Sequence, residues 1–473
     1  MNMTDEQIPV HELAPSEVGE LDLYQKRERI YTRKVEGFFQ KIRLYTGWPL
    51  LILYFGVPWL RWEGRQAVWF DLPGRKFHIF EFTFWPQDFP MLAWLLMIAA
   101  FGLFTVTVFA GRVWCGYTCP QTVWTSIFMW SEQVSEGTRN QRIKLDQGPW
   151  TLNKIARKTL KHGMWLGFAA LTGITFVGYF SPIRELVVDL PTGNASFWAY
   201  AWSVFFTLST YINAGWMREQ VCIYMCPYAR FQSVMFDRDT LIVSYDERRG
   251  EPRGSRKKNA DRDTLGLGDC IDCRLCVQVC PTGIDIRNGL QYQCITCALC
   301  IDACNSVMDK MSYPRGLIRY TTENSLEGRP SRILRPRLIG YIVAVLALST
   351  LFVTVLLGRI PVGLDAIRER GQLYREVSGG LIENVYTLKI RNMSQAAATY
   401  ALSVSGLPDV EIIGETEVSL DAGEVFTLPV ALRMPRDSLG TGNVEVVFEI
   451  QSTTDERVRD AAESRFLGPA PGG

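Results

Sequence analysis

Two cysteine-rich runs have the residue type and spacing of iron-sulfur sites. The first, D-C-I-D-C-R-L-C-V-Q-V-C-P, covers Asp269 to Pro281, and the second, C-I-T-C-A-L-C-I-D-A-C, covers Cys294 to Cys304. Each has the spacing Cys-x2-Cys-x2-Cys-x3-Cys, the bacterial signature of a 4Fe-4S cluster. Zinc sites favour two well-separated Cys-x2-Cys pairs instead. The spacing therefore predicts two 4Fe-4S clusters, although Asn305 follows the second run where proline is usual.

The spacing also predicts which cysteines share a cluster. Three closely spaced thiolates can bind three corners of a cluster, but the loop cannot bend back sharply enough to bring its own fourth cysteine to the fourth corner. In two-cluster ferredoxins that ligand comes from the other run. We therefore assign Cys270, Cys273, Cys276 and Cys304 to the first cluster, and Cys294, Cys297, Cys300 and Cys280 to the second. Such a pair stores and relays single electrons.

The other four of the twelve cysteines occur in two copies of a smaller pattern, W-C-G-Y-T-C-P from Trp114 and V-C-I-Y-M-C-P from Val221. A separation of four positions places both sulfur atoms on one face of a helix. Soft thiolates select copper(I), zinc or iron-sulfur. The alternative is that these cysteines are small buried hydrophobic residues. Because the pattern recurs, we predict that Cys115, Cys119, Cys222 and Cys226 are metal-handling thiols.

The elements that must position these cysteines are helices in a membrane. A bilayer core needs about 20 apolar residues in a helix. Four windows without a charged residue meet this length, and a fifth, shorter window has tryptophans at its ends. In chain order, the five windows are the shorter Leu44 to Leu60, then Met91 to Ala110, Gly163 to Ile183, Ala195 to Met217 and Leu338 to Leu357. The sequence therefore predicts a multi-domain membrane protein with about five transmembrane helices, and its net charge near zero gives no reason to expect nucleic acid.

Lys and Arg crowd into the segments before the first window, between the second and third, and between the fourth and fifth. The positive-inside rule places those segments, and all the cysteines, in or against the cytoplasm. The predicted organisation is a basic cytoplasmic segment (1–43), four transmembrane helices with both Cys-x3-Cys-Pro motifs (44–230), a cytoplasmic two-cluster ferredoxin-like domain (231–337), a fifth transmembrane helix (338–357) and an outer domain (358–473). The first forty residues are polar and charged, so no cleavable signal peptide is expected.

The outer domain has no cysteine and a different pattern. Runs such as N-V-Y-T-L-K-I-R-N and N-V-E-V-V-F-E-I-Q-S alternate apolar and polar residues and are separated by Gly, Pro and Asp turns. Short strands at this spacing are typical of a small β-sandwich of immunoglobulin-like type. A docking or structural role is the expectation for this domain.

Taken together, F-W-P-Q-D-F-P, W-C-G-Y-T-C-P-Q-T-V-W, R-E-Q-V-C-I-Y-M-C-P-Y-A-R-F-Q, the two-cluster insert and the strand-rich tail resemble the CcoG family, also called FixG or RdxA. The resemblance runs over nearly the whole chain from Tyr24. It implies a multi-pass protein of the bacterial inner membrane, with a periplasmic tail, that reduces copper(II) to copper(I) for assembly of cbb3-type cytochrome c oxidase. Its implied partners are membrane lipid, oxidase subunits or their assembly and copper-transfer factors, and an electron donor that no flavin or nicotinamide fingerprint identifies.

Two other hypotheses fit the same residues. The same Cys-x3-Cys-Pro pairs occur in membrane quinol-oxidising subunits of the periplasmic nitrate-reductase type, so the clusters could exchange electrons with quinone. Alternatively, the chain is a non-enzymatic copper-binding scaffold whose clusters are structural or redox-sensing. The immunoglobulin-like tail favours oxidase assembly over the quinone-linked subunit.

Overall fold

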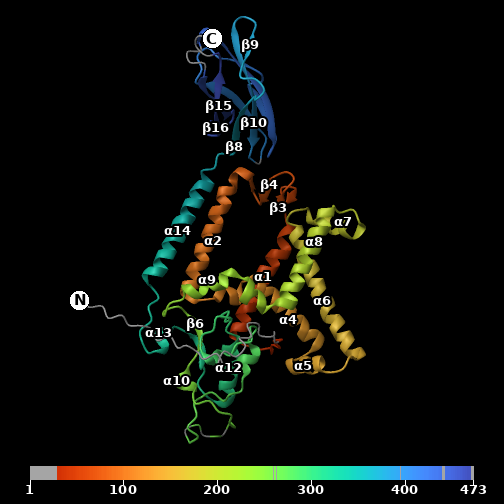
Figure 1. Ribbon diagram of the computed structural model, residues 1–473, viewed down its shortest axis with the longest axis vertical. Coiled ribbons are helices and arrows are strands. Elements are labelled where there is room, and N and C mark those ends of the chain that lie inside the picture. Colours follow the sequence, from red (N-terminus) through yellow and green to blue (C-terminus); the bar gives the residue numbers. More distant parts are fainter. Residues whose placement is uncertain are drawn as a thin grey trace, which may run out of the picture.

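The computed structural model describes residues 29–469, except for residues 259, 261, 263, 395 and 439–442. The first 28 residues of the predicted basic segment therefore lie outside the described residues. Three regions follow one another along the long axis of the molecule: a β domain at one end, a group of long helices in the middle and the cysteine-rich region at the other end (Figure 1).

Two of the helices are long and apolar enough to cross a membrane. They are α2 (Phe89–Ala110), which follows the short turn η2 (Pro86–Asp88), and α14 (Pro336–Leu357). The two helices lie side by side (Figure 1) and contact each other through Phe101, Phe104 and Tyr341. Only 11% of the apolar window of α2 and 6% of that of α14 is buried inside the protein. Unlike the core helix of a soluble protein, they expose their apolar side chains.

The other three predicted windows are mainly helical, but among the described residues only α2 and α14 meet the length and hydropathy of a membrane span. This is fewer than the five predicted. The first window lies in α1 (Phe38–Gly56) and the turn η1 (Val57–Trp59). The third window lies in α6 (Leu152–Val177) and reaches the start of α7 (Ile183–Thr192). The first turns of α6 carry several charged residues. The fourth begins as α8 (Phe197–Thr210) and continues as the π-helical segment η3 (Tyr211–Met217).

A small antiparallel sheet joins the helices to the β domain. It consists of β3 (Val68–Asp71), β4 (Lys76–Ile79) and β5 (Phe82–Phe84), and is preceded by the two-residue strands β1 (Arg61–Trp62) and β2 (Arg65–Gln66). Lys76 Nζ donates a hydrogen bond to the Gly423 carbonyl oxygen at 2.8 Å. Arg359 forms an ion pair with Asp88 at 2.5 Å and donates to the Thr83 carbonyl oxygen at 3.0 Å. These contacts fix the start of the β domain to the sheet.

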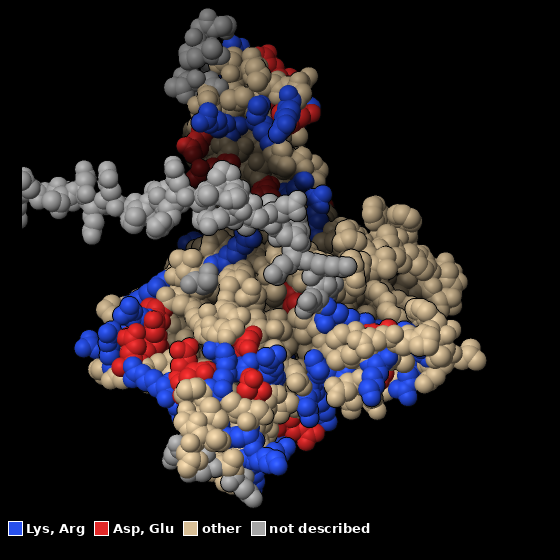
Figure 2. Space-filling model, turned by 60° about the horizontal axis from the view of Figure 1, so that its bottom comes forward, with Lys and Arg blue, Asp and Glu red and all other residues tan. Residues whose placement is uncertain are grey.

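The opposite end of the helical region is held by a buried network of charges. Its elements are α3 (Val113–Tyr117), α4 (Pro120–Glu136), α5 (Arg139–Gln147), η4 (Val221–Met225) and α9 (Pro227–Met235). Glu132 on α4 accepts from Arg142 at 2.8 Å, from Arg29 at 3.3 Å and from Arg218 at 2.5 Å. One turn later, Glu136 pairs with Lys158 and Lys161 of α6. Figure 2 shows charged side chains gathered over this end of the molecule, beside a broad surface that has none.

The cysteine-rich region is built around a two-stranded antiparallel sheet. Strand β6 (Ile242–Tyr245) pairs with β7 (Ile318–Thr321), and the intervening elements are α10 (Glu247–Gly250), α11 (Leu275–Val279), η5 (Ile286–Asn288) and α12 (Leu299–Met311); α13 (Glu323–Leu326) follows. Both carboxylate oxygens of Asp302, on α12, accept from the first backbone N–H groups of α1, at Phe39 (3.2 Å) and Gln40 (2.8 Å). A residue of the cysteine-rich region thus caps a helix of the helical region.

The tail forms the predicted two-sheet β-sandwich. One sheet has the strand order β12-β14-β10-β8, with β9 also paired to β10, and the other has the order β13-β11-β15-β16. The strands are β8 (Val362–Arg368), β9 (Arg375–Val377), β10 (Leu381–Asn392), β11 (Ala398–Ser405), β12 (Glu411–Ile413), β13 (Glu417–Leu420), β14 (Val425–Pro435), β15 (Asn443–Ser452) and β16 (Arg459–Leu467), with the turn η6 (Arg436–Ser438) after β14. Every second residue is buried along β10, from Leu428 in β14 and from Val446 in β15, which is why the alternating pattern revealed this domain.

Candidate metal centres

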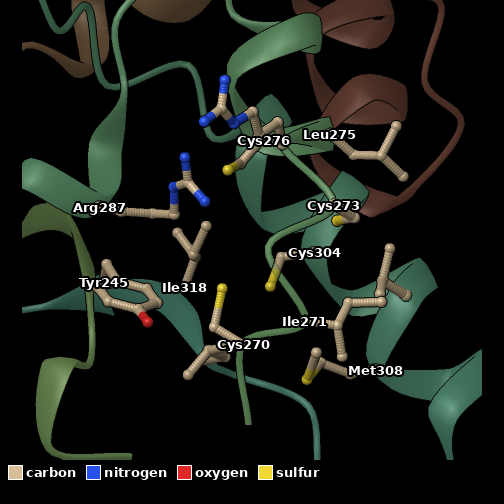
Figure 3. Close-up of a pocket in the computed structure, with 13 residues that line it drawn as sticks. Tyr245, Cys270, Ile271, Cys273, Leu275, Cys276, Arg287, Cys304, Met308 and Ile318 are labelled. Carbon is tan, nitrogen blue, oxygen red and sulfur yellow. The ribbon is translucent and has the colours of Figure 1, made fainter. Parts of the chain in front are cut away.

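The four cysteines assigned to the first cluster line one cavity. Cys270, Cys273, Cys276 and Cys304 surround a shared space (Figure 3), although Cys304 is 28 residues along the chain from Cys276. Most of the remaining wall is apolar and includes Leu275, Met308 and Ile318. Four thiols around a cavity with apolar walls fit a cluster held by thiolates and shielded from water.

A second cavity is lined by Cys280, Cys294, Cys297 and Cys300, the four cysteines assigned to the second cluster. Its remaining lining contains no charged side chain. Cys276 borders this cavity as well as the first, so the two sites share a wall. Two clusters in these cavities would be close enough for single electrons to pass between them.

The backbone repeats the same unusual conformation at both sites. Asp272 and Arg274 flank the second cysteine of the first run, and Thr296 and Ala298 flank the second cysteine of the second run. All four have positive φ, between 49° and 60°. A non-glycine residue in this region costs on the order of 1 kcal/mol or more. Residues of this kind that alternate with residues of ordinary φ curl the loop, and a curled loop can turn its N–H groups towards an anionic centre. The repeated strain therefore fits a loop that wraps around a metal-thiolate cluster.

Burial makes the thiols of both sites difficult to ionise in the absence of a metal. It raises the pKa of Cys276, Cys304 and Cys294 to about 12. Iron bound at these positions would hold the sulfur atoms as thiolates instead. Arg287 borders the first cavity, but Asp285 and Asp272 pair with its guanidinium at 2.6 and 2.5 Å. Its positive charge is thus balanced within the protein.

The structure brings the two membrane motifs to the same end of the helical region. Cys115 lies in α3, directly after α2, and Cys222 lies in η4; Cys119 and Cys226 immediately precede α4 and α9. Burial raises the pKa of Cys222 to about 12, and the neighbouring Cys119, Cys115 and Cys226 thiols raise it further. The four thiols are therefore electrostatic neighbours. In the part of the chain that the structure describes, however, no three His, Cys, Asp or Glu side chains are close enough to chelate one metal ion.

The first membrane motif packs directly against the second cavity. Cys115 belongs to the same buried cluster of side chains as Cys297, Ile295 and Val279. A Cβ atom added to Gly116 would lie 2.8 Å from the Ile295 carbonyl oxygen and 2.9 Å from Cys297 Cα, so only glycine allows this approach. The second site therefore contacts both the first site, through Cys276, and the motif around Cys115.

Two polar residues beside Cys115 were not predicted from the sequence. Gln232 is fully buried, and its Oε1 atom accepts from Arg112 Nε at 2.9 Å and from the Cys115 thiol at 3.5 Å. Arg112 also donates from Nη1 to the Tyr292 carbonyl oxygen at 2.6 Å. The sequence contained one signal for Arg112: it follows a long window without charges and lies only three positions before Cys115.

Comparisons with known proteins agree with this arrangement. A family model described as a 4Fe-4S dicluster domain matches residues 217–323, and one described as the IG-like fold at the C-terminal of FixG matches residues 352–469. The nitrogen fixation protein FixG of Rhizobium meliloti is 36% identical over 499 residues, which cover 95% of each chain. The chain belongs to the FixG family. The predicted resemblance, the iron-sulfur domain and the immunoglobulin-like tail are thereby confirmed.

Other members of the FixG family are equally similar. Protein RdxB of Cereibacter sphaeroides is 42% identical over 86% of this chain and 88% of its own, and protein RdxA of the same organism is 39% identical over 88% and 91%. Among solved structures, a FixG-related protein from Vibrio parahaemolyticus is 36% identical and covers 23% of this chain and 95% of its own, with a TM-score of 0.21.

The comparisons also bear on the membrane motifs. A further family model, described as a 4Fe-4S binding domain, matches residues 92–133, which include Cys115 and Cys119. The dicluster match from residue 217 includes Cys222 and Cys226. This FixG-family chain is therefore an iron-sulfur electron-transfer protein, and its membrane thiols lie within segments matched by iron-sulfur models.

Proposed function

We propose that this protein is a membrane-bound iron-sulfur oxidoreductase that reduces copper(II) to copper(I) at Cys115, Cys119, Cys222 and Cys226, and that the copper(I) serves the assembly of a cbb3-type cytochrome c oxidase. The observation that carries the proposal is the packing of the first membrane motif against the second cysteine-lined cavity. Soft thiolates at this position can bind a soft metal ion such as copper(I), which would receive the electrons.

Each half of the site has a separate task. The eight-cysteine region would hold two 4Fe-4S clusters, which supply single low-potential electrons when bound. The first cavity is the entry side, because Cys273 is the one exposed thiol among the twelve cysteines. The second cavity is the exit side, because it contacts the motif around Cys115. One electron from a reduced cluster converts one copper(II) ion to copper(I), and soft thiolates stabilise the product.

The proposed setting is the bacterial inner membrane, crossed five times. Besides α2 and α14, the helices α1, α6 and α8 expose large apolar side chains that a soluble protein would bury. They include Trp48, Ile52 and Leu53 on α1, Leu160, Leu166 and Leu171 on α6, and Trp198, Trp202 and Phe205 on α8. In this orientation the cysteine-rich region is cytoplasmic and the β-sandwich is periplasmic, where it is available to dock oxidase subunits or assembly factors.

A quinone-linked function is the second candidate, and one feature favours it. A groove of about 560 Å³ between α6 and α8 is lined by apolar residues such as Trp150, Leu166 and Leu208. Two polar residues meet on its wall, where His162 Nδ1 lies 2.7 Å from the Tyr211 hydroxyl. Lys158 and Thr159 also line the groove, and a mainly apolar groove with a few polar groups suits a quinone headgroup.

One experiment distinguishes the two candidates. The protein is purified without oxygen, its clusters are reduced with dithionite, excess reductant is removed, and either copper(II) or a soluble quinone is added. The proposal predicts that copper(II) oxidises the clusters and yields copper(I) in matching amount, and that Cys119→Ser with Cys226→Ser abolishes this reaction. Oxidation by quinone alone would support the second candidate. If neither acceptor oxidises the clusters, the chain is a copper-binding scaffold.

A further inference from the structure

Arg112 is a buried cation without a negative partner. It follows α2 almost directly, and only 5% of its surface is exposed. Its hydrogen bonds go to two neutral acceptors, the Gln232 side chain and the Tyr292 carbonyl oxygen. Among the residues that the structure describes, Arg112 forms no ion pair with a carboxylate. A buried guanidinium in this state is costly unless an opposite charge compensates it.

The other buried arginines of the described chain all have such a partner. Four are buried besides Arg112, and each pairs with at least one carboxylate: Arg142 and Arg218 with Glu132, Arg287 with Asp285 and Asp272, and Arg335 with Asp237. Among the buried arginines that the structure describes, Arg112 alone lacks a carboxylate partner; the buried Lys154 likewise donates only to carbonyl oxygens, at Asp146 and Gly148.

Arg112 lies between the two sets of thiols. Gln232 Oε1 accepts from both Arg112 and Cys115, and the guanidinium also interacts directly with the Cys115 sulfur of the first membrane motif. On its other side, Arg112 holds the carbonyl oxygen of Tyr292, two residues before Cys294 of the second cavity. The cation therefore borders both sets of thiols, through Gln232 on one side and the Tyr292 carbonyl oxygen on the other.

We propose that Arg112 is the shared counter-charge of the second cluster and of the Cys115 thiolate in the first membrane motif. It acts as a positioning residue that stabilises the more negative state of each centre. This inference rests on the cluster assignment under the proposed function. A cluster bound by four thiolates is anionic and becomes more negative on reduction, so a nearby fixed cation raises its reduction potential. Arg112 would therefore make the second cluster, beside the exit, the easier one to reduce.

Arg43 provides an internal comparison. Its Nε atom donates to the Gly116 carbonyl oxygen at 3.0 Å, so it lies at the same contact. Arg43 is only half-buried, however, and water screens its charge more strongly than that of Arg112. Removal of the Arg43 charge is expected to change the potential less.

The test is a redox titration monitored by electron paramagnetic resonance, without copper. Cys304→Ser provides a background that keeps only the second cluster, and Cys280→Ser one that keeps only the first. In the Cys304→Ser background, Arg112→Gln is expected to lower the midpoint potential of the second cluster. Arg112→Lys keeps the charge, so its potential is expected to stay near that of the Cys304→Ser protein. Gln232→Glu places a carboxylate against Arg112 and is expected to lower the potential as Arg112→Gln does. Arg43→Gln is the control matched to Arg112→Gln, and it is expected to lower the midpoint potential less.

The outcomes separate this inference from the copper proposal. If Arg112→Gln does not retain the cluster, Gln232→Glu and Arg112→Lys still test the inference, because neither removes a cation from the site. A lower midpoint potential in Gln232→Glu than in Arg112→Lys would support it. An unchanged potential in Gln232→Glu and Arg112→Gln, or an equal shift of the first cluster in the Cys280→Ser background, would overturn the inference. Copper is absent throughout, so failure of copper reduction in the separate assay would leave these results intact.

Discussion

The backbone of Gly116 lies directly against the backbone of Cys297. Gly116 belongs to the first membrane motif and Cys297 to the second cysteine-lined cavity, 181 positions later in the chain. The distance of 2.9 Å between a Cβ atom built on Gly116 and Cys297 Cα leaves no room for a side chain. This contact makes the helical region and the cysteine-rich region one electron-transfer unit rather than two domains on a tether.

Substitution of this glycine should loosen the contact. Gly116→Ala forces α3 and the second cavity apart and is expected to cost about 1–3 kcal/mol of stability. Transfer of electrons from reduced clusters to copper(II) should slow by an order of magnitude or more, since small displacements of reacting groups can cost on the order of 100-fold in rate. Stopped-flow bleaching of the cluster absorbance measures this. Gly102→Ala in α2, where an added Cβ meets nothing within 4 Å, is the matched control. Equal rates in the two variants would contradict the proposed contact.

The crossed ligand assignment can be tested cysteine by cysteine. Cys304→Ser should remove the first cluster and Cys280→Ser the second, because each side chain lines the cavity of the other run. Each variant is expected to lose roughly half of the iron. Iron analysis gives the amount, and the remaining spin signal identifies the cluster. Pairing within each run would reverse the outcome, since Cys304→Ser would then affect the second cluster.

Iron-free protein should show a clear order of thiol reactivity. Cys273 is exposed, whereas burial raises the pKa of Cys276 and Cys304 to about 12. A thiol stays protonated and unreactive below its pKa, so iodoacetamide at neutral pH should modify Cys273 first. Labelling of the other two should increase as the pH is raised. Peptide mass mapping provides the readout, and early labelling of Cys304 would argue against the described burial.

The ion network around Glu132 should control the stability of the helical region at low pH. Burial alone would raise the pKa of Glu132, but Arg218, Arg142 and Arg29 outweigh it and lower the pKa from its ordinary value of 4.5. The stabilisation is therefore present above about pH 4.5 and is lost as the pH falls through the lower folded-state value.

Substitution at Glu132 tests the same network at neutral pH. Glu132→Gln leaves buried arginines without a counter-charge and is expected to cost about 3–5 kcal/mol. Thermal unfolding in detergent should show a markedly lower midpoint. Glu327→Gln, which removes one exposed pair with Arg329, should change stability by less than about 1 kcal/mol. Similar midpoints for the two variants would show that the network is not stabilising.

Much of this architecture follows from local sequence patterns. The cysteine spacing predicted which four cysteines line each of the two cavities, and period-two alternation predicted the β-sandwich. The segments from Gly163 to Ile183 and from Ala195 to Met217 were harder, since a break after Val177 and a π-helical segment from Tyr211 interrupt windows that hydropathy reads as continuous. The role of Arg112 could not be predicted. It depends on contacts with Gln232 and Tyr292, which are 120 and 180 positions away.

Single-turnover electron transfer in the two single-cluster variants shows which cluster delivers electrons to copper. Reduced Cys304→Ser protein, which keeps the second cluster beside Cys115, is mixed with one equivalent of copper(II), and copper(I) is followed together with the loss of the cluster signal. This variant is expected to reduce copper at close to the rate of the parent protein, whereas reduced Cys280→Ser, with only the first cluster, should do so far more slowly. Equal rates in the two variants, or faster transfer from the first cluster, would contradict the claim that electrons leave through the second cluster to the membrane thiols.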